Sequence, residues 1–515
     1  MKKIGNSTTT RVADTERKTQ LNFIGIDVGT SAAKVIVIDE TGKVLASSSQ
    51  EYPVHYPHVG WAEQDPEDWW QGVKAGIVDV LSDPLVKTDS VRAIGLTGQM
   101  HGLVALDSAN RVLLPAILWN DQRTQAECDE ITETIGQDKL TECTGNKALT
   151  GFTAPKILWV KKNHPKLFKR IAHILLPKDY IRFRLSGDFA TDVSDASGTL
   201  MFDVKNRKWS SEMSDLLELP VEALPKCYES SEVTGVVSES VKSELGLKGE
   251  VLIVAGASDQ AAGAVGTGTV EPGTVSVSLG TSGVVFAPQE HYAVDSNNRL
   301  HAFCHANGKW HTMGVMLSAA SCLKWWIDNV HFGLPNPYYT LLSEADDVPA
   351  GSRGLFFLPY LMGERTPHSD PNARGGFIGL TMSHTRAEMT RAILEGVAYG
   401  LNDSLQIIRE LGIPVDQVRV TGGGAKSRLW RSILADVFGT LINSSRSSEG
   451  PAFGAAVLAA VGSGEFSSVY SACRELSETT ETNQPNPENV KRYREGHSTF
   501  QGLYADLKER FRELV

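Results

Sequence analysis

The sequence lacks long hydrophobic runs, and no stretch approaches the roughly 20 apolar residues that a membrane span requires. Its first residues also lack the apolar segment of a signal peptide. The 6 cysteines are widely scattered, and no two of them have the spacing of a metal site or a redox motif. We therefore expect reduced thiols, a cytoplasmic location and no membrane partner.

Positively charged residues are also fewer than negatively charged ones. The chain has 50 Lys and Arg against 61 Asp and Glu, a formal net charge of −11, and no local basic patch. A nucleic-acid partner is therefore not expected, and an anionic ligand would need donors gathered at its own site. The Walker sequence Gly-x-x-x-x-Gly-Lys-Ser/Thr is absent as well, which disfavours a P-loop nucleotide enzyme.

What the chain has is the size and composition of a soluble globular protein with at least two domains. It contains 515 residues, of which 41% are hydrophobic and 22% charged. Predicted strands and helices alternate, which favours an α/β architecture. We expect a flexible tail over residues 1–20, a first domain over 21–248, a second over 249–470, and a C-terminal extension with a final helix over 471–515.

One short element occurs twice, as Ile-Asp-Val-Gly-Thr-Ser at 26–31 and as Val-Ser-Leu-Gly-Thr-Ser at 277–282. Each copy lies between two runs rich in β-branched residues, a pattern that predicts strand, tight turn, strand. The turns Gly29-Thr30 and Gly280-Thr281 would aim backbone N–H groups and a hydroxyl at phosphate oxygens, because glycine permits close approach. Two such turns, one in each half, suit a nucleotide held from opposite sides.

A third glycine-rich turn, Gly422-Gly423-Gly424, follows a predicted strand at 417–421 and precedes a predicted helix at 428–438. Such a turn suits a nucleotide, since the helix N-terminus favours a phosphate or the rim of a ribose. Connections from strand to helix use glycine in any case, so this turn is weak evidence alone. Together with the two Gly-Thr turns it supplies a third wall of a nucleotide cleft.

Two aspartates stand where chemistry is expected, and each has a structural alternative. Asp27 follows a hydrophobic strand: it would hold Mg²⁺ beside the phosphates, or form an ordinary Asx turn. Asp259 lies between a strand at 251–255 and a helix of small residues. It would cap that helix, or accept the proton of an attacking hydroxyl while the helix dipole keeps it ionised.

Met100 and His101 come soon after a buried strand at 91–96, at the strand end where open α/β sheets place ligands. A lone histidine is often a satisfied structural residue. The alternative is a partner for a sugar hydroxyl, favoured by the glycine at 102 and the strand end.

With these residues taken together, the chain resembles the FGGY carbohydrate kinases, whose superfamily also holds actin, hexokinase and the heat-shock chaperone ATPases. The turns at 27–30, 280–281 and 422–424 look like the superfamily's two phosphate motifs and its adenosine motif. Residues 151–163 match the first FGGY signature and 375–380 the second. The resemblance covers residues 22 to 465. It implies a two-domain actin/hexokinase-like, ribonuclease H-like ATPase fold with the active site in the interdomain cleft.

The resemblance also implies roles for residues. The segment 99–102 is similar to the substrate segment of the family's xylulose-phosphorylating members, and the Arg-Glu pair of the glycerol-phosphorylating members is absent. Met100, His101 and Asp259 would then contact a ketopentose, with Asp259 as proton acceptor and Asp27 as the acidic residue beside Mg²⁺. ATP would be held by a larger set: Gly29, Thr30, Gly280, Thr281, Gly423, Gly424 and Ser427.

The function that follows from the resemblance is ATP-dependent phosphorylation of D-xylulose at its terminal hydroxyl. Three alternatives stay open: a kinase for ribulose, L-xylulose or gluconate; an actin-like or chaperone-like nucleotide switch with no small-molecule acceptor; and a non-catalytic sugar-binding regulator. The two sugar-family signatures argue against the switch, and the presence of both aspartates argues against the regulator. A homodimer is expected because homodimers are common among relatives.

Overall fold

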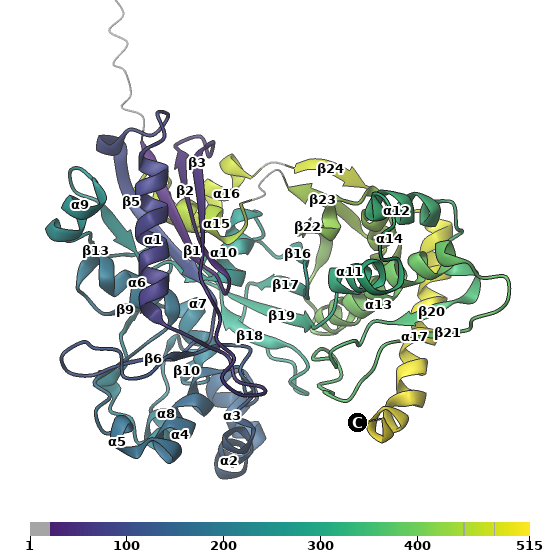
Figure 1. The fold of residues 1–515 in the computed structure, drawn as a ribbon, viewed down its shortest axis with the longest axis horizontal. Coiled ribbons are helices and arrows are strands. Elements are labelled where there is room, and N and C mark those ends of the chain that lie inside the picture. Colours follow the sequence, from purple (N-terminus) through teal and green to yellow (C-terminus); the bar gives the residue numbers. More distant parts are fainter. Residues whose placement is uncertain (1–20, 446–448, 478, 515) are drawn as a thin grey trace, which may run out of the picture.

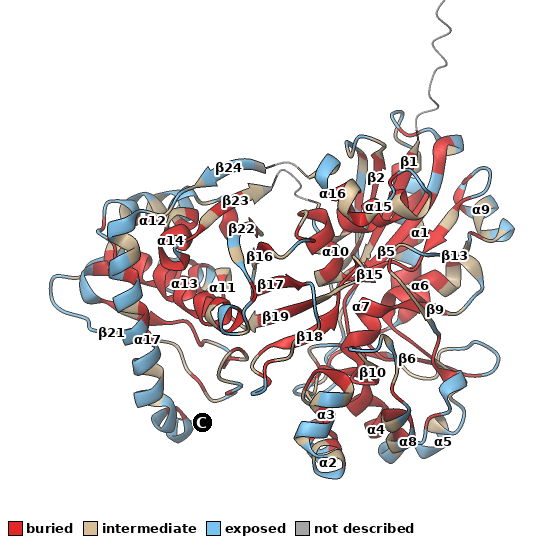
Figure 2. Ribbon diagram, turned by 180° about the vertical axis from the view of Figure 1, so that it is seen from behind, coloured by how far each residue is buried: buried red, intermediate tan, exposed pale blue. Residues whose placement is uncertain are grey.

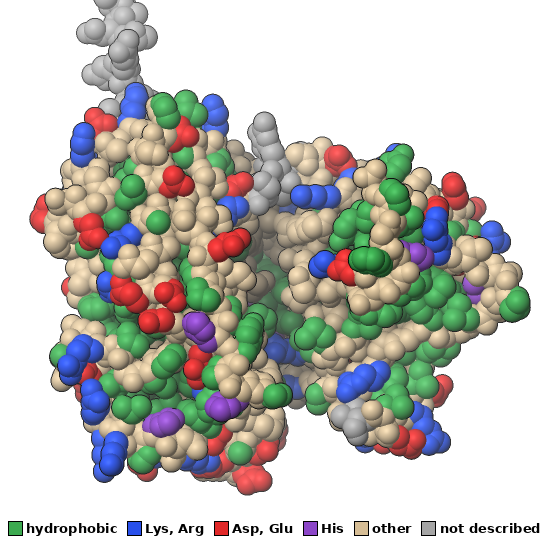
Figure 3. Space-filling view, viewed as in Figure 1, with side chains coloured by type: hydrophobic (Ala, Val, Ile, Leu, Met, Phe, Trp, Pro, Cys, Tyr) green, Lys and Arg blue, Asp and Glu red, His purple; other side chains and the backbone are tan. Residues whose placement is uncertain are grey.

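The protein consists of two lobes side by side, each built around a β-sheet (Figure 1). The computed structural model describes residues 21–445, 449–477 and 479–514. The expected tail over residues 1–20 lies outside the described residues. Figure 3 shows the surface deeply hollowed between the lobes.

The first sheet has seven strands, in the order β13-β14-β5-β1-β2-β3 with β15 also paired to β5. Strands β1, β2 and β3 form an antiparallel meander, whereas β5, β14 and β15 run parallel to one another and to β1. Helix α1 (Pro66–Leu81) packs on β2 and β3. The strand bounds are β1 (Asn22–Val28), β2 (Ala32–Asp39), β3 (Val44–Glu51), β5 (Val91–Gly98), β13 (Val233–Val236), β14 (Leu252–Val254) and β15 (Ala257–Ser258).

The second sheet repeats this topology. Its seven strands lie in the order β18-β19-β17-β16-β22-β23-β24, with β16, β17 and β19 antiparallel and β22 and β23 parallel to β16. The strand bounds are β16 (Gly273–Leu279), β17 (Gly283–Gln289), β18 (His301–Cys304), β19 (Trp310–Met316), β22 (Val415–Thr421), β23 (Leu441–Ser445) and β24 (Thr479–Asn483). The two-domain α/β fold is therefore confirmed, with one sheet topology used twice.

Helix α15 (Pro451–Gly462) follows strand β23 of the second sheet in the chain, yet it packs on β1 and β5 of the first. Glycine permits this contact: a Cβ on Gly25 or Gly95 would come within 1.9 Å of a carbonyl oxygen of α15. Helix α10 (Asp259–Gly266) packs beside α15, and both are largely buried in Figure 2. Strands β14 and β15 and helix α15 thus belong to the first lobe, so the lobes do not divide at residue 248.

The core of the second lobe is formed by helices packed on its sheet. Helix α13 (Arg386–Glu410) is buried along most of its length and contacts α11 (Ala320–Val330) and α14 (Arg428–Phe438). The final helix, α17 (Pro487–Glu513), packs against α14. Within the described ranges, no helix is long and apolar enough to cross a membrane.

Candidate active site

Three parallel strands of the first lobe end at the same edge and bring Asp27 and Asp259 together. Asp27 in β1 lies opposite Thr97 in β5, and Ala257 in β15 lies opposite the same Thr97. Asp259 begins helix α10 directly after β15. The carboxyl ends of parallel strands are where α/β sheets place ligands.

Both carboxyl groups have raised pKa values. Burial is the main cause for Asp27, whose pKa reaches about 7; the charge of Asp259 adds to the shift and Lys34 opposes it. Burial likewise raises the pKa of Asp259 to about 6. Lys34 faces Asp27 across the β1–β2 ladder, and its ammonium lies 2.8 Å from Glu449. Two adjacent carboxylates removed from water favour a proton or a cation between them.

Ser258, and not Asp259, caps helix α10. The hydroxyl of Ser258 accepts a hydrogen bond from the N–H of Ala261 at 3.4 Å. Oxygen Oδ1 of Asp259 is buried and has no hydrogen-bond partner among the described residues. Since buried polar atoms are nearly always paired, this oxygen is left for a ligand, and the capping interpretation of Asp259 is wrong.

Side chains donate hydrogen bonds to the carbonyl groups of the first Gly-Thr turn. The Tyr52 hydroxyl donates to the carbonyl of Gly29 at 2.6 Å, and Gln64 Nε2 donates to that of Thr30 at 2.7 Å. The backbone N–H groups of Thr30 and Ser31 donate to no group in the described part of the chain. The turn therefore presents donors, as a phosphate requires.

The second Gly-Thr turn also presents its N–H groups, but its carbonyl groups accept hydrogen bonds from the start of helix α11. The N–H groups of Ala319 and Ala320 donate to the carbonyls of Thr281 and Gly280 at 2.9 and 2.8 Å. The N–H groups of Thr281 and Ser282 donate to no described residue. Both predicted strand-turn-strand elements thus form, one in each lobe.

The third glycine-rich turn lies against the second. Gly422 has φ 88°, and a Cβ there would come within 2.6 Å of the Leu279 carbonyl oxygen. Gly423 faces open space, whereas Gly424 packs on the Leu279 side chain. Ser427 is the N-cap of helix α14, where its hydroxyl accepts a backbone N–H. Gly423 is thus open to a ligand, while Gly422 and Ser427 fix the local backbone.

His101 presents a free acceptor. Its Nδ1 donates to the carbonyl of Gly198 at 2.5 Å, and burial lowers its pKa to about 3, so the ring is neutral. Nitrogen Nε2 has no hydrogen bond to a described residue, which suits a sugar hydroxyl as donor. A Cβ on Gly198 would come within 2.8 Å of both the His101 ring and the Met100 methyl group, so the two side chains lie together as expected.

Lys156 is a residue of this site for which no role was predicted. It is fully buried in helix α4 (Thr153–Asn163), and its ammonium donates to the carbonyls of His101 at 2.9 Å and Gly151 at 2.7 Å. One of these bonds anchors the carbonyl of His101, whose φ of 69° lies in the left-handed region. The signal was visible in the sequence, because a lysine stands within the apolar part of this helix.

An edge strand of the second lobe closes the base of the cleft. The ring of Phe303 in β18 lies 6.4 Å from that of His101 and 6.3 Å from that of Phe152. The Asn146 side chain donates to the carbonyl of Ala302 in β18 at 2.9 Å. The first-lobe segment that carries His101 is thus packed against the second sheet.

Comparison with known proteins decides the family. The pattern of the FGGY family of carbohydrate kinases, N-terminal domain, matches residues 22–266, and that of the C-terminal domain matches residues 275–463. The chain belongs to the FGGY family of carbohydrate kinases. As an FGGY kinase it is an enzyme that uses ATP to phosphorylate a sugar.

Relatives of known name resemble this FGGY kinase over nearly its whole length. Xylulose kinase of Escherichia coli is 42% identical over 94% of this chain and 99% of its own. The crystal structure of a "xyloylose kinase" from Brucella ovis is 37% identical, with a TM-score of 0.89 over 95% of this chain and 99% of the other. Gluconate kinase of Lactobacillus acidophilus is 28% identical, with a TM-score of 0.91 over 96% of this chain and 100% of its own.

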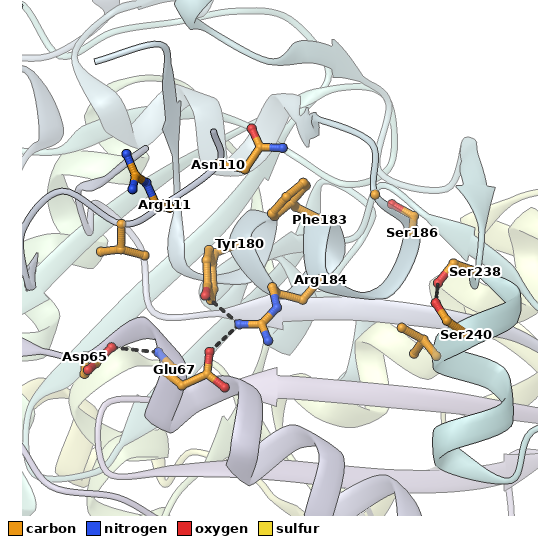
Figure 4. Close-up of a pocket in the computed structure, with 13 residues that line it drawn as sticks. Asp65, Glu67, Asn110, Arg111, Tyr180, Phe183, Arg184, Ser186, Ser238 and Ser240 are labelled. Carbon is orange, nitrogen blue, oxygen red and sulfur yellow. Dashed lines mark hydrogen bonds and ion pairs between the residues drawn. The ribbon is translucent and has the colours of Figure 1, made fainter. Parts of the chain in front are cut away.

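The FGGY kinase has a further cavity, away from this site. It encloses about 720 Å³ and is lined by first-lobe residues that include Tyr180, Arg184 and Glu67 (Figure 4). Arg184 is already paired there, with Glu67 at 2.5 Å and the Tyr180 hydroxyl at 2.7 Å. None of the predicted catalytic or ligand-binding residues lines this cavity, so it is not the predicted active site.

Proposed function

We propose that the protein transfers the γ-phosphoryl group of ATP to the terminal hydroxyl of D-xylulose, giving D-xylulose 5-phosphate and ADP. The observation that carries the proposal is the buried, unpartnered Oδ1 of Asp259 beside Asp27. Asp259 accepts the hydroxyl proton as the sugar oxygen bonds to phosphorus in line with the leaving group. The bond from that phosphorus to the β,γ-bridging oxygen breaks, and ADP leaves.

The same pair of aspartates fits Mg²⁺. This ion usually takes one or two protein carboxylates and completes its shell with water and substrate phosphates. Asp27 would hold the ion, whose charge would offset that of the triphosphate, while the two Gly-Thr turns bind phosphate oxygens.

The choice of D-xylulose rests on the substrate segment and on relatives. Met100 and a neutral His101 with a free acceptor nitrogen lie together near the cleft. The xylulose kinase of Escherichia coli is 42% identical. Gluconate kinase shares the fold at a lower identity of 28%, so gluconate stays an outcome of the test, as do ribulose and L-xylulose.

A coupled ADP-release assay tests the proposal over D-xylulose, L-xylulose, D-ribulose, gluconate and glycerol, with and without Mg²⁺. We expect the highest kcat/KM for D-xylulose and a requirement for Mg²⁺. Asp259→Asn should lower kcat by roughly 10²–10⁴-fold, the usual value of a general base. A clear preference for another acceptor would overturn the substrate, and sugar-independent ADP release would indicate a nucleotide switch.

Two further properties belong to the proposal. We propose a homodimer, which light scattering on the purified protein tests. We also propose a cytoplasmic location, because ATP is the phosphoryl donor and the 6 cysteines are all unpaired thiols. Fractionation of cells that express the chain tests the location.

A further inference from the structure

A buried charged cluster lies next to the helix that carries Asp259. The ammonium of Lys178 is 2.6 Å from Asp179, 3.0 Å from Asp192 and 3.4 Å from Asp195, and these four residues are at most 1% exposed. They come from helix α6 (Pro177–Ser186), strand β9 (Ala190–Asp192) and helix α7 (Val193–Ala196). Burial of so many charges is costly, and an apolar core of the same shape is often as stable.

A chain of hydrogen bonds joins this cluster to the catalytic edge. Oxygen Oδ1 of Asp192 pairs with Lys178, and Oδ2 accepts the N–H of Ser194 at 2.7 Å and its hydroxyl at 2.6 Å. The hydroxyl oxygen of Ser194 accepts the N–H of Ser258 at 2.9 Å. Ser258 caps α10 and directly precedes Asp259. Each hydrogen-bonded group orients the next one, from the buried Lys178 ammonium to the start of helix α10.

We propose that Ser194, held by Asp192 and Lys178, is a positioning residue that sets the carboxylate of Asp259 for proton transfer. This inference rests on the proposed function, because Ser194 acts only through Asp259, the proposed proton acceptor. Ser194 itself is assigned no contact with substrate. The charge of Asp259 acts on the cluster. Burial raises the pKa of Asp195, and the charge of Asp259 adds to this rise. Asp259 directly follows Ser258, so the direction of its carboxylate depends on the backbone at Ser258.

The test compares Ser194→Ala with a control that perturbs the same carboxylate. The hydroxyl of Ser230 also donates to Asp192 Oδ2, at 3.0 Å, and is equally buried, but its side chain makes no hydrogen bond to Ser258. We expect Ser194→Ala to lower kcat by about 10- to 100-fold with KM for sugar and ATP within about twofold of the parent. Ser230→Ala should keep kcat within about threefold at a similar loss of melting temperature. Equal losses of kcat in the two variants would overturn the inference.

Two more variants separate positioning from general stability. Ser194→Thr retains the hydroxyl and should restore most of the lost kcat. Because Ser194 acts through Asp259, adding Ser194→Ala to Asp259→Asn should lower kcat no further. A multiplicative loss in the double variant would overturn the inference, and an unchanged kcat in Asp259→Asn alone would overturn the proposed base instead.

Discussion

The two Gly-Thr turns occupy equivalent places in two sheets of the same topology, yet they are built differently. In the first, the strand carries Asp27, and side chains such as Tyr52 hold the turn carbonyls. In the second, Ser278 stands where Asp27 does, and the carbonyls are held by backbone N–H groups at the start of α11 and by the Ser321 hydroxyl. Both turns present free N–H groups through the same backbone geometry, whereas the carboxylate is confined to one copy.

The strongest test of this comparison removes the side-chain chemistry at each of the two equivalent positions in turn. Asp27→Asn should lower kcat by roughly 100-fold or more, since it removes the carboxylate that would hold Mg²⁺. Ser278→Ala should stay within about threefold, because that turn acts through its backbone. Steady-state kinetics at several Mg²⁺ concentrations measures both. Similar losses in the two variants would mean that the turns are not specialised.

A smaller effect is expected at the glycines beside the second turn. Gly422→Ala places a Cβ 2.6 Å from the Leu279 carbonyl oxygen at a positive φ, so unfolding free energy should fall by about 1–3 kcal/mol. KM for ATP should rise with it, because the turn is displaced.

Gly423→Ala is the matched control, since Gly423 has φ −62° and open space around its Cβ. Its unfolding free energy should change by less than about 0.5 kcal/mol, while KM for ATP rises if the nucleotide lies over it. Denaturant unfolding and ATP titration separate the two. An unchanged KM in Gly423→Ala would remove this residue from the ATP site.

The smallest effect is the dependence of stability on pH. The folded state raises the pKa of Asp27 to about 7, so ionisation of Asp27 opposes folding, and its destabilising effect grows as pH rises from about 4 to 7. Asp27→Asn should therefore have a higher unfolding free energy than the parent at pH 8, and no such gain at pH 4. Ser278→Ala should show no such pH dependence. A gain for Asp27→Asn that is the same at both pH values would contradict the raised pKa.

Local patterns predicted much of the fold and part of the site. The helix predicted at 428–438 is α14, and the β-branched runs on either side of each Gly-Thr turn form the paired strands. The capping of α10 was not predicted correctly, because both Ser258 and Asp259 are good N-caps and only the observed backbone distinguishes them. Lys156 lay in a recognised signature, but its bonds to His101 and Gly151 depend on a loop distant in sequence.

The sequence by itself determined the repeated turns, the acidic residue in only one of them and the family resemblance, because these follow from short-range backbone chemistry and residue identity. Only the tertiary structure decided that α15 returns to the first sheet over Gly25 and Gly95, and that Lys178 supports the start of α10 through Ser194. Such contacts join segments far apart in the chain and are selected by shape and the pairing of buried charges, which no local pattern records.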